Sequence, residues 1–222
     1  MDKWRQNSRR SRPAASRRRA GTDATTRVDD PSDRSVVGQQ VGPYFFPAYA
    51  GVAFSNNEFR WSPRIKRDDG LVRIVAGLGT RAVDRVGDDY PILIAPGQPN
   101  LRVNVTIDET IRYSQKKIDV IDLETNEFKT VDFDMIVKKF GHLYKGINHI
   151  ASTVEGTMLR PVGFNTEYES EDLYITFEGL FKDTNFIKKI RTMLTTLEDK
   201  MKCPVDIEFA SDGDSLYLLQ CR

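Results

Sequence analysis

Four polar residues near the C-terminus have the types and the spacing of a site for a metal ion and phosphate. Asp206 and Glu208 alternate with apolar residues, so in an extended strand both carboxylates project from one face. Gln220 and Arg222 share a face in the same way, after the turn residues 211–214. If even-numbered residues pair with even-numbered residues, all four side chains gather on one face, and a slip of one residue separates them.

The chemistry that fits such a patch is metal-assisted binding of nucleotide phosphates. Carboxylate and amide oxygens, as in Glu208 and Gln220, are ligands that Mg²⁺ takes when it shares its coordination with phosphate oxygens. A guanidinium such as that of Arg222 binds two phosphate oxygens together and stabilises the charge on a transferring phosphoryl group. The residues alone leave one alternative open, an ordinary hairpin whose charges face water.

The elements that must position these residues are short strands mixed with helices. Apolar runs bounded by turn residues predict strands at residues 50–55, 71–76, 101–107, 117–123, 127–133, 173–177, 205–210 and 216–222. Apolar residues spaced by three and four predict a helix over residues 184–201, and a shorter helix is expected over residues 135–144. Because strands and helices do not alternate regularly, the pattern predicts an α+β fold.

Three motifs, taken in order, resemble one family. Residues 206–209 and 218–222 read Asp-Ile-Glu-Phe and Leu-Leu-Gln-Cys-Arg, and they resemble the end of the ATP-grasp nucleotide-binding domain of phosphoenolpyruvate synthase and pyruvate, phosphate dikinase. Residues 50–55 resemble a strand of that domain, and residues 70–79 resemble its strand leading into Gly-Leu-Gly. The resemblance implies that residues 36–222 form the C-terminal part of an ATP-grasp domain, with a mixed, mostly antiparallel sheet and packed helices.

The resemblance also implies the ligands, ATP and Mg²⁺, and a role for each residue. Glu208 and Gln220 match the metal and ATP ligands of the family, and Asp206 matches a neighbouring acid at the ATP site. Arg222 matches the catalytic arginine that meets the ATP phosphates. In this family of phosphotransferases, a phosphoryl group from ATP passes to a histidine on a separate domain and then to pyruvate. Rifampin phosphotransferases share the nucleotide domain but use a different acceptor.

The chain also departs from the family pattern. A lysine and an arginine that clamp the phosphates belong to a half of the domain that should precede Val36, where the residues are few and polar. Thr80 stands where the family commonly has an acid. The phosphohistidine domain should follow Arg222. We therefore expect a part of a dikinase-like enzyme that is inactive alone and needs the missing parts from a neighbouring polypeptide.

Residues 1–35 are predicted to be a disordered, Arg-rich tail, because they contain too little apolar surface to offset the entropy of ordering. Basic segments bind phosphate backbones non-specifically. No aromatic interleaving accompanies the arginines, so nucleic acid is not an expected partner. The alternative function is a degenerate nucleotide-binding or interaction module without catalysis, whose tail contacts polyanions.

Other classes of protein are excluded by composition. The two cysteines, Cys203 and Cys221, are too few for a disulfide scaffold or a cysteine zinc cluster. No run of 18 apolar residues is present, so no membrane-spanning helix is predicted. Because no apolar segment follows the N-terminal arginines, a secretory signal does not fit, and a cytoplasmic location is expected.

Overall fold

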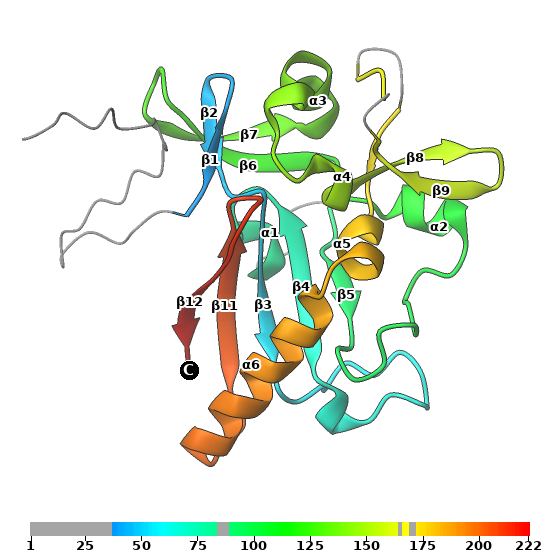
Figure 1. Cartoon of the computed structure of the whole chain (residues 1–222), viewed down its shortest axis with the longest axis vertical. Helices are drawn as coiled ribbons and strands as arrows, with labels where there is room; N and C mark the ends of the chain where they lie inside the picture. The colour runs from blue at the N-terminus through cyan, green and yellow to red at the C-terminus, as the bar shows by residue number, and fades with distance from the viewer. Residues whose placement is uncertain (1–36, 84–88, 164–165, 169–171) are drawn as a thin grey trace, which may run out of the picture. The chain divides into compact units, whose positions relative to one another are not determined.

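The computed structural model of the chain describes residues 37–83, 89–163, 166–168 and 172–222 (Figure 1). The predicted tail, residues 1–35, lies outside the described residues. Within the described residues the strands form three sheets, and every strand pair is antiparallel. Helices pack against these sheets, which confirms the predicted α+β fold with mostly antiparallel sheets.

The central sheet carries the hairpin that the sequence analysis singled out. Its strand order is β12-β11-β3-β4-β5, so β12 and β5 form its edges. Neighbours in the sheet are also consecutive strands in the chain, except where β11 pairs with β3. The strands are β3 (Tyr49–Phe54), β4 (Leu71–Ala76), β5 (Ile92–Ile94), β11 (Asp206–Ser211) and β12 (Leu216–Cys221).

Two smaller sheets complete the strand content of the described residues. The second sheet has the order β1-β2-β6-β7, with β1 (Gln39–Val41), β2 (Tyr44–Phe46), β6 (Lys117–Asp122) and β7 (Glu127–Asp132). The third sheet has the order β10-β8-β9, with β8 (Ala151–Glu155), β9 (Met158–Pro161) and β10 (Tyr174–Ile175). The predicted hairpin over residues 117–133 is thus β6 and β7.

The helices of the described residues are short, apart from α6. Helix α6 confirms the helix that the sequence predicts over residues 184–201. Among the described residues, no helix has the length and apolar character needed to cross a membrane. The helices are α1 (Thr80–Val83), α2 (Ile107–Arg112), α3 (Phe133–Phe140), α4 (Ile147–Ile150), α5 (Glu178–Asp183) and α6 (Phe186–Met201), with single 3-10 turns at Arg67–Asp69 and Gly141–Leu143.

The long helix α6 covers one face of the central sheet, here called the helix face (Figure 1). Phe186, Ile190 and Leu194 are its buried residues, at the spacing of a helical stripe. The ring of Phe186 lies 5.7 Å from that of Phe209 in β11. Strand alternation therefore directs Glu208, next to Phe209, to the opposite face, which we call the site face.

The strand predicted over residues 101–107 is wrong. This segment is irregular up to Val105, and α2 begins at Ile107. Thr106 Oγ1 accepts a hydrogen bond from Glu109 N at 3.2 Å, and the Glu109 carboxylate accepts one from Thr106 N at 3.2 Å. This reciprocal capping box starts helix α2 and satisfies its first backbone donors. The alternation of apolar residues in the segment does not reveal this helix start.

Candidate functional site

The register of the C-terminal hairpin brings the four predicted site residues together. Glu208 lies directly opposite Gln220. Asp206 and Arg222 exchange both backbone hydrogen bonds, at 3.0 and 2.8 Å. Even-numbered residues therefore pair with even-numbered residues at this end of the hairpin, and all four side chains belong to the site face.

A β-bulge in the hairpin produces this register. Nearer the turn, Phe209 pairs with Leu218 and Ala210 with Tyr217, so even residues pair with odd ones there. The register shifts between Glu208 and Phe209, which leaves Leu219 as the extra residue in β12. Without the bulge, Glu208 would lie opposite Leu219, and Gln220 would turn to the helix face.

The site residues are accessible and carry a weak internal ion pair. The Arg222 guanidinium forms an ion pair with the Glu208 carboxylate, and the side chains are 65% and 36% exposed. Asp206 and Gln220 are also exposed. Because exposed ion pairs contribute only about 0–1 kcal/mol, a phosphate can replace Glu208 as the partner of Arg222 at little cost.

The donor set of the site suits Mg²⁺ shared with phosphate. It consists of the carboxylates of Asp206 and Glu208 and the amide oxygen of Gln220, all hard oxygen donors. The described residues contain no group of three or more His, Cys, Asp or Glu side chains placed to hold a metal ion. Such a site fits an ion that takes its remaining ligands from phosphate and water, rather than an ion held by protein alone.

The turn that joins β11 to β12 is held by Asp212. Its carboxylate accepts hydrogen bonds from Asp214 N at 2.9 Å, from Ser215 N at 2.8 Å and from the Tyr217 hydroxyl at 2.8 Å. Burial raises the pKa of Asp212, but these hydrogen bonds outweigh burial and hold the pKa below its usual value. The charged form of Asp212 therefore stabilises the hairpin.

Replacing Asp212 by alanine is expected to lower the free energy of unfolding by about 1–2 kcal/mol at pH 7, because three donors lose their acceptor. Because the pKa of Asp212 is lowered in the folded state, its contribution to the free energy of unfolding is complete above the unfolded-state pKa of about 3.9. This contribution is lost as the pH falls through the folded-state pKa. Urea unfolding should show the difference shrinking below pH 4. Asp214→Ala, which removes only an exposed ion pair with Lys145, is the control, and an equal loss there would contradict the prediction.

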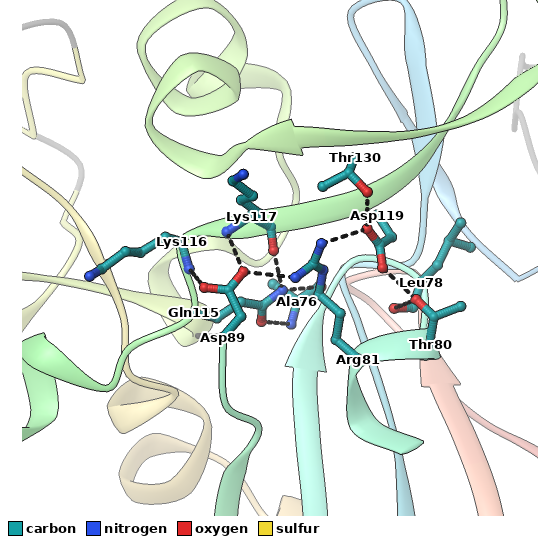
Figure 2. Close-up of polar contacts among 10 residues, drawn as sticks. All are labelled: Ala76, Leu78, Thr80, Arg81, Asp89, Gln115, Lys116, Lys117, Asp119 and Thr130. Carbon is teal, nitrogen blue, oxygen red and sulfur yellow. Dashed lines mark hydrogen bonds and ion pairs between the residues drawn. The ribbon is translucent and has the colours of Figure 1, made fainter. Parts of the chain in front are cut away.

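The Gly-Leu-Gly segment, residues 77–79, forms the turn from β4 into α1 and lies against β6 of the second sheet (Figure 2). Gly77 has φ +80°, and a Cβ atom there would lie 2.2 Å from Ile118 Cγ2. Leu78 N donates a hydrogen bond to Asp119 O at 2.9 Å. The glycine is therefore required both by the backbone conformation and by the close approach of β6.

A buried ion-pair network, which the sequence analysis did not identify, fixes this turn. Arg81 is 4% exposed and binds Asp89 at 2.9 Å and Asp119 at 3.1 Å. Thr80 Oγ1 donates to the other Asp119 oxygen at 2.6 Å, and Thr130 Oγ1 donates to Asp119 at 2.7 Å (Figure 2). Thr80 stands where the family commonly has an acidic residue. In this chain the Thr80 hydroxyl binds an acidic residue of another strand, Asp119 in β6.

Gln115 ties the same two sheets together beside the network. Its side chain accepts a hydrogen bond from Ala76 N at 2.8 Å and donates to Ala76 O at 2.9 Å and to Lys117 O at 2.7 Å (Figure 2). Ala76 ends β4, and Lys117 begins β6. Most of the polar contacts around the glycine turn are buried, and apart from Arg81 Nε the buried groups of Arg81, Gln115 and Asp119 are hydrogen-bonded, so we assign them a structural role at the end of the central sheet.

The sequence of the chain matches the model of a known protein family. Residues 23–222 match the family described as the pyruvate phosphate dikinase AMP/ATP-binding domain. The match begins within the segment that the sequence analysis assigned to the tail and includes all four site residues. No curated protein matches the chain. Since the match covers most of the sequence, the chain belongs to the family of pyruvate phosphate dikinase AMP/ATP-binding domains.

Proposed function

We propose that this chain is the Mg²⁺–ATP-binding part of a dikinase-like phosphotransferase. The observation that carries the proposal is the bulged register, which places Glu208 opposite Gln220, with Asp206 and Arg222 beside them on one accessible face. Membership of an AMP/ATP-binding domain family supports a nucleotide as the ligand.

Each residue has a proposed task. Glu208 and Gln220 would hold Mg²⁺, which when bound neutralises phosphate charge, and Asp206 would add a second carboxylate beside them. Arg222 would exchange its ion pair with Glu208 for a bidentate contact with a phosphate of ATP, stabilising charge on the transferring phosphoryl group.

The phosphoryl acceptor and the remaining phosphate contacts would come from other domains. We propose a histidine carrier domain, with pyruvate as the final acceptor, and a clamp of lysine and arginine from the preceding half of an ATP-grasp domain. By this proposal the chain alone binds nucleotide weakly and turns over nothing. Formation of phosphoenolpyruvate by the isolated chain would contradict this part of the proposal.

Calorimetric titration with ATP tests the proposed site, with and without Mg²⁺. Glu208→Gln is expected to weaken Mg²⁺-dependent ATP binding by about tenfold or more, because it removes the anionic ligand while keeping the shape of the side chain. Glu155→Gln is the matched control, since Glu155 also forms an exposed ion pair with an arginine, Arg160, but lies in the third sheet.

Two outcomes would contradict the proposal. One is Mg²⁺-dependent ATP binding that Glu208→Gln leaves unchanged. The other is an absence of ATP binding together with salt-sensitive binding of a polyanion that disappears when residues 1–20 are deleted. The second outcome would support the alternative, an interaction module without catalysis.

A further inference from the structure

Strand β12 forms an edge of the central sheet that no other described strand covers (Figure 1). Within the described residues it pairs with β11 alone, so one side of its backbone has no strand partner. Arg222 and Asp206 exchange both backbone hydrogen bonds, so the N–H and C=O groups of the preceding residue, Cys221, point away from β11. Leu218 and Leu219 of the same strand are 45% and 50% exposed. An exposed, apolar edge strand is a template for pairing with another strand.

The other edge strands among the described residues carry features that oppose such pairing. Strands β1, β5 and β10 have only two or three residues each. Strand β7 carries three charged residues, and β9 carries Arg160 and ends at Pro161. Short strands, charges and proline are devices by which proteins prevent edge-to-edge pairing. Apart from the bulge at Leu219, β12 has none of these features, because it consists of six residues, Leu-Tyr-Leu-Leu-Gln-Cys, without charge or proline.

Opposite charges at the two ends of β12 make the strand complementary to a second copy of itself. Asp214 precedes the strand and Arg222 follows it, and their side chains are 71% and 65% exposed. If two copies of β12 lie antiparallel, the Asp214 end of each copy lies beside the Arg222 end of the other, whereas a parallel pair would place like charges together. Within the chain these residues pair with Lys145 and Glu208, and exchange of such exposed pairs costs little.

We propose that two copies of this chain associate through β12, which lies antiparallel to the β12 of the second copy. The twofold axis of such a pair is perpendicular to the sheet, so the two five-stranded sheets join into one and both site faces lie on the same side. Residues 1–35 suit this edge less well, because they contain no run of apolar or β-branched residues as long as β12. Since the contact consists of one strand pair, we expect a weak dimer with a Kd of about 1–100 μM. Association through this edge does not require ATP, so it goes beyond the proposed function.

Sedimentation velocity of the full chain without nucleotide tests the association. Over a concentration range of about 2–200 μM, we expect the weight-average sedimentation coefficient to rise from that of a monomer towards that of a dimer. Leu218→Lys places a charge on the exposed edge and should raise the Kd of the dimer about tenfold or more. Phe128→Lys is the matched control, because Phe128 is 57% exposed on β7, an edge strand of the second sheet, and this variant should leave the Kd unchanged.

Two charge variants test the direction of the strand pair. Asp214→Lys and Arg222→Glu each place like charges at both ends of the antiparallel pair, so each variant alone should dimerise about tenfold more weakly. An equal mixture of the two restores opposite charges at both ends and should form dimers at the concentration that the unmodified chain requires. The inference is overturned if the unmodified chain stays monomeric at about 200 μM or assembles beyond a dimer, where one closed strand pair is expected. It is also overturned if Leu218→Lys and Phe128→Lys have equal effects, or if the mixture associates no better than its components.

Discussion

Replacing Arg81 by methionine is expected to lower the free energy of unfolding by about 3–5 kcal/mol, because removal of one partner leaves buried charges uncompensated. The side chains of Arg81, Asp89 and Asp119 are 5%, 9% and 4% exposed. Methionine has a similar length, so it fills the space but offers no donor to either carboxylate. Urea unfolding followed by circular dichroism measures the change, with a lower midpoint expected at an unchanged slope.

The control for this variant is the same substitution in an exposed ion pair. Arg67 binds Glu58 at 2.7 Å, and their side chains are 65% and 70% exposed. Exposed pairs contribute about 0–1 kcal/mol, so Arg67→Met should change the unfolding free energy little. Equal effects of Arg81→Met and Arg67→Met would show that the buried network does not hold the glycine turn in place.

Local patterns in the sequence predicted much of the fold. The strand predicted over residues 71–76 forms β4 with the same bounds, because a short run that is apolar except for Arg73 and is flanked by Gly70 and Gly77 favours a strand. The helix predicted over residues 184–201 is α6, which begins at Phe186. Its buried residues include Leu194, whereas the apolar Met201 is 48% exposed at the end of the helix.

The order of strands could not be predicted from local patterns. That β11 lies between β12 and β3 depends on contacts between residues about 150 positions apart, such as Glu208 and Val52. Glu208 pairs with Val52 and Val52 with Arg73, and this alignment of Arg73 with Glu208 across the sheet has no signal in the sequence near either residue. A cavity of about 710 Å³ beside β5 could not be predicted for the same reason, since several separate segments of the chain line it.

The candidate site shows the same division between local and long-range information. Alternation of Asp206 with Glu208, and of Gln220 with Arg222, was sufficient to propose a common face within each strand. The register between the strands depends on Leu219, an exposed extra residue that a strand pattern does not distinguish from its neighbours. The sequence pattern therefore gathers the four side chains only if even-numbered residues pair with even-numbered residues, and the bulge that produces this pairing is seen only in the structure.

Replacing Gly77 by alanine is expected to lower the free energy of unfolding by about 2–5 kcal/mol. A positive φ costs a residue with a Cβ atom about 1–2 kcal/mol, and forcing an extra methyl group into a packed region costs about 1–3 kcal/mol. At Gly77 both apply, because φ is +80° and the added Cβ would lie 2.2 Å from Ile118 Cγ2 and 2.8 Å from Asp119 O. Urea unfolding at pH 7 measures the loss.

Gly156→Ala separates these two causes. Gly156 also has a positive φ, +60°, but an added Cβ meets no atom within 4 Å, so only the conformational cost of about 1–2 kcal/mol should appear. The difference between the two variants then measures the steric contact between the glycine turn and β6. If Gly77→Ala costs no more than Gly156→Ala, strand β6 can move away from the turn. Asp119 would then be free to shift relative to Arg81, and the rigid connection between the second sheet and the central sheet would have to come from Gln115 instead.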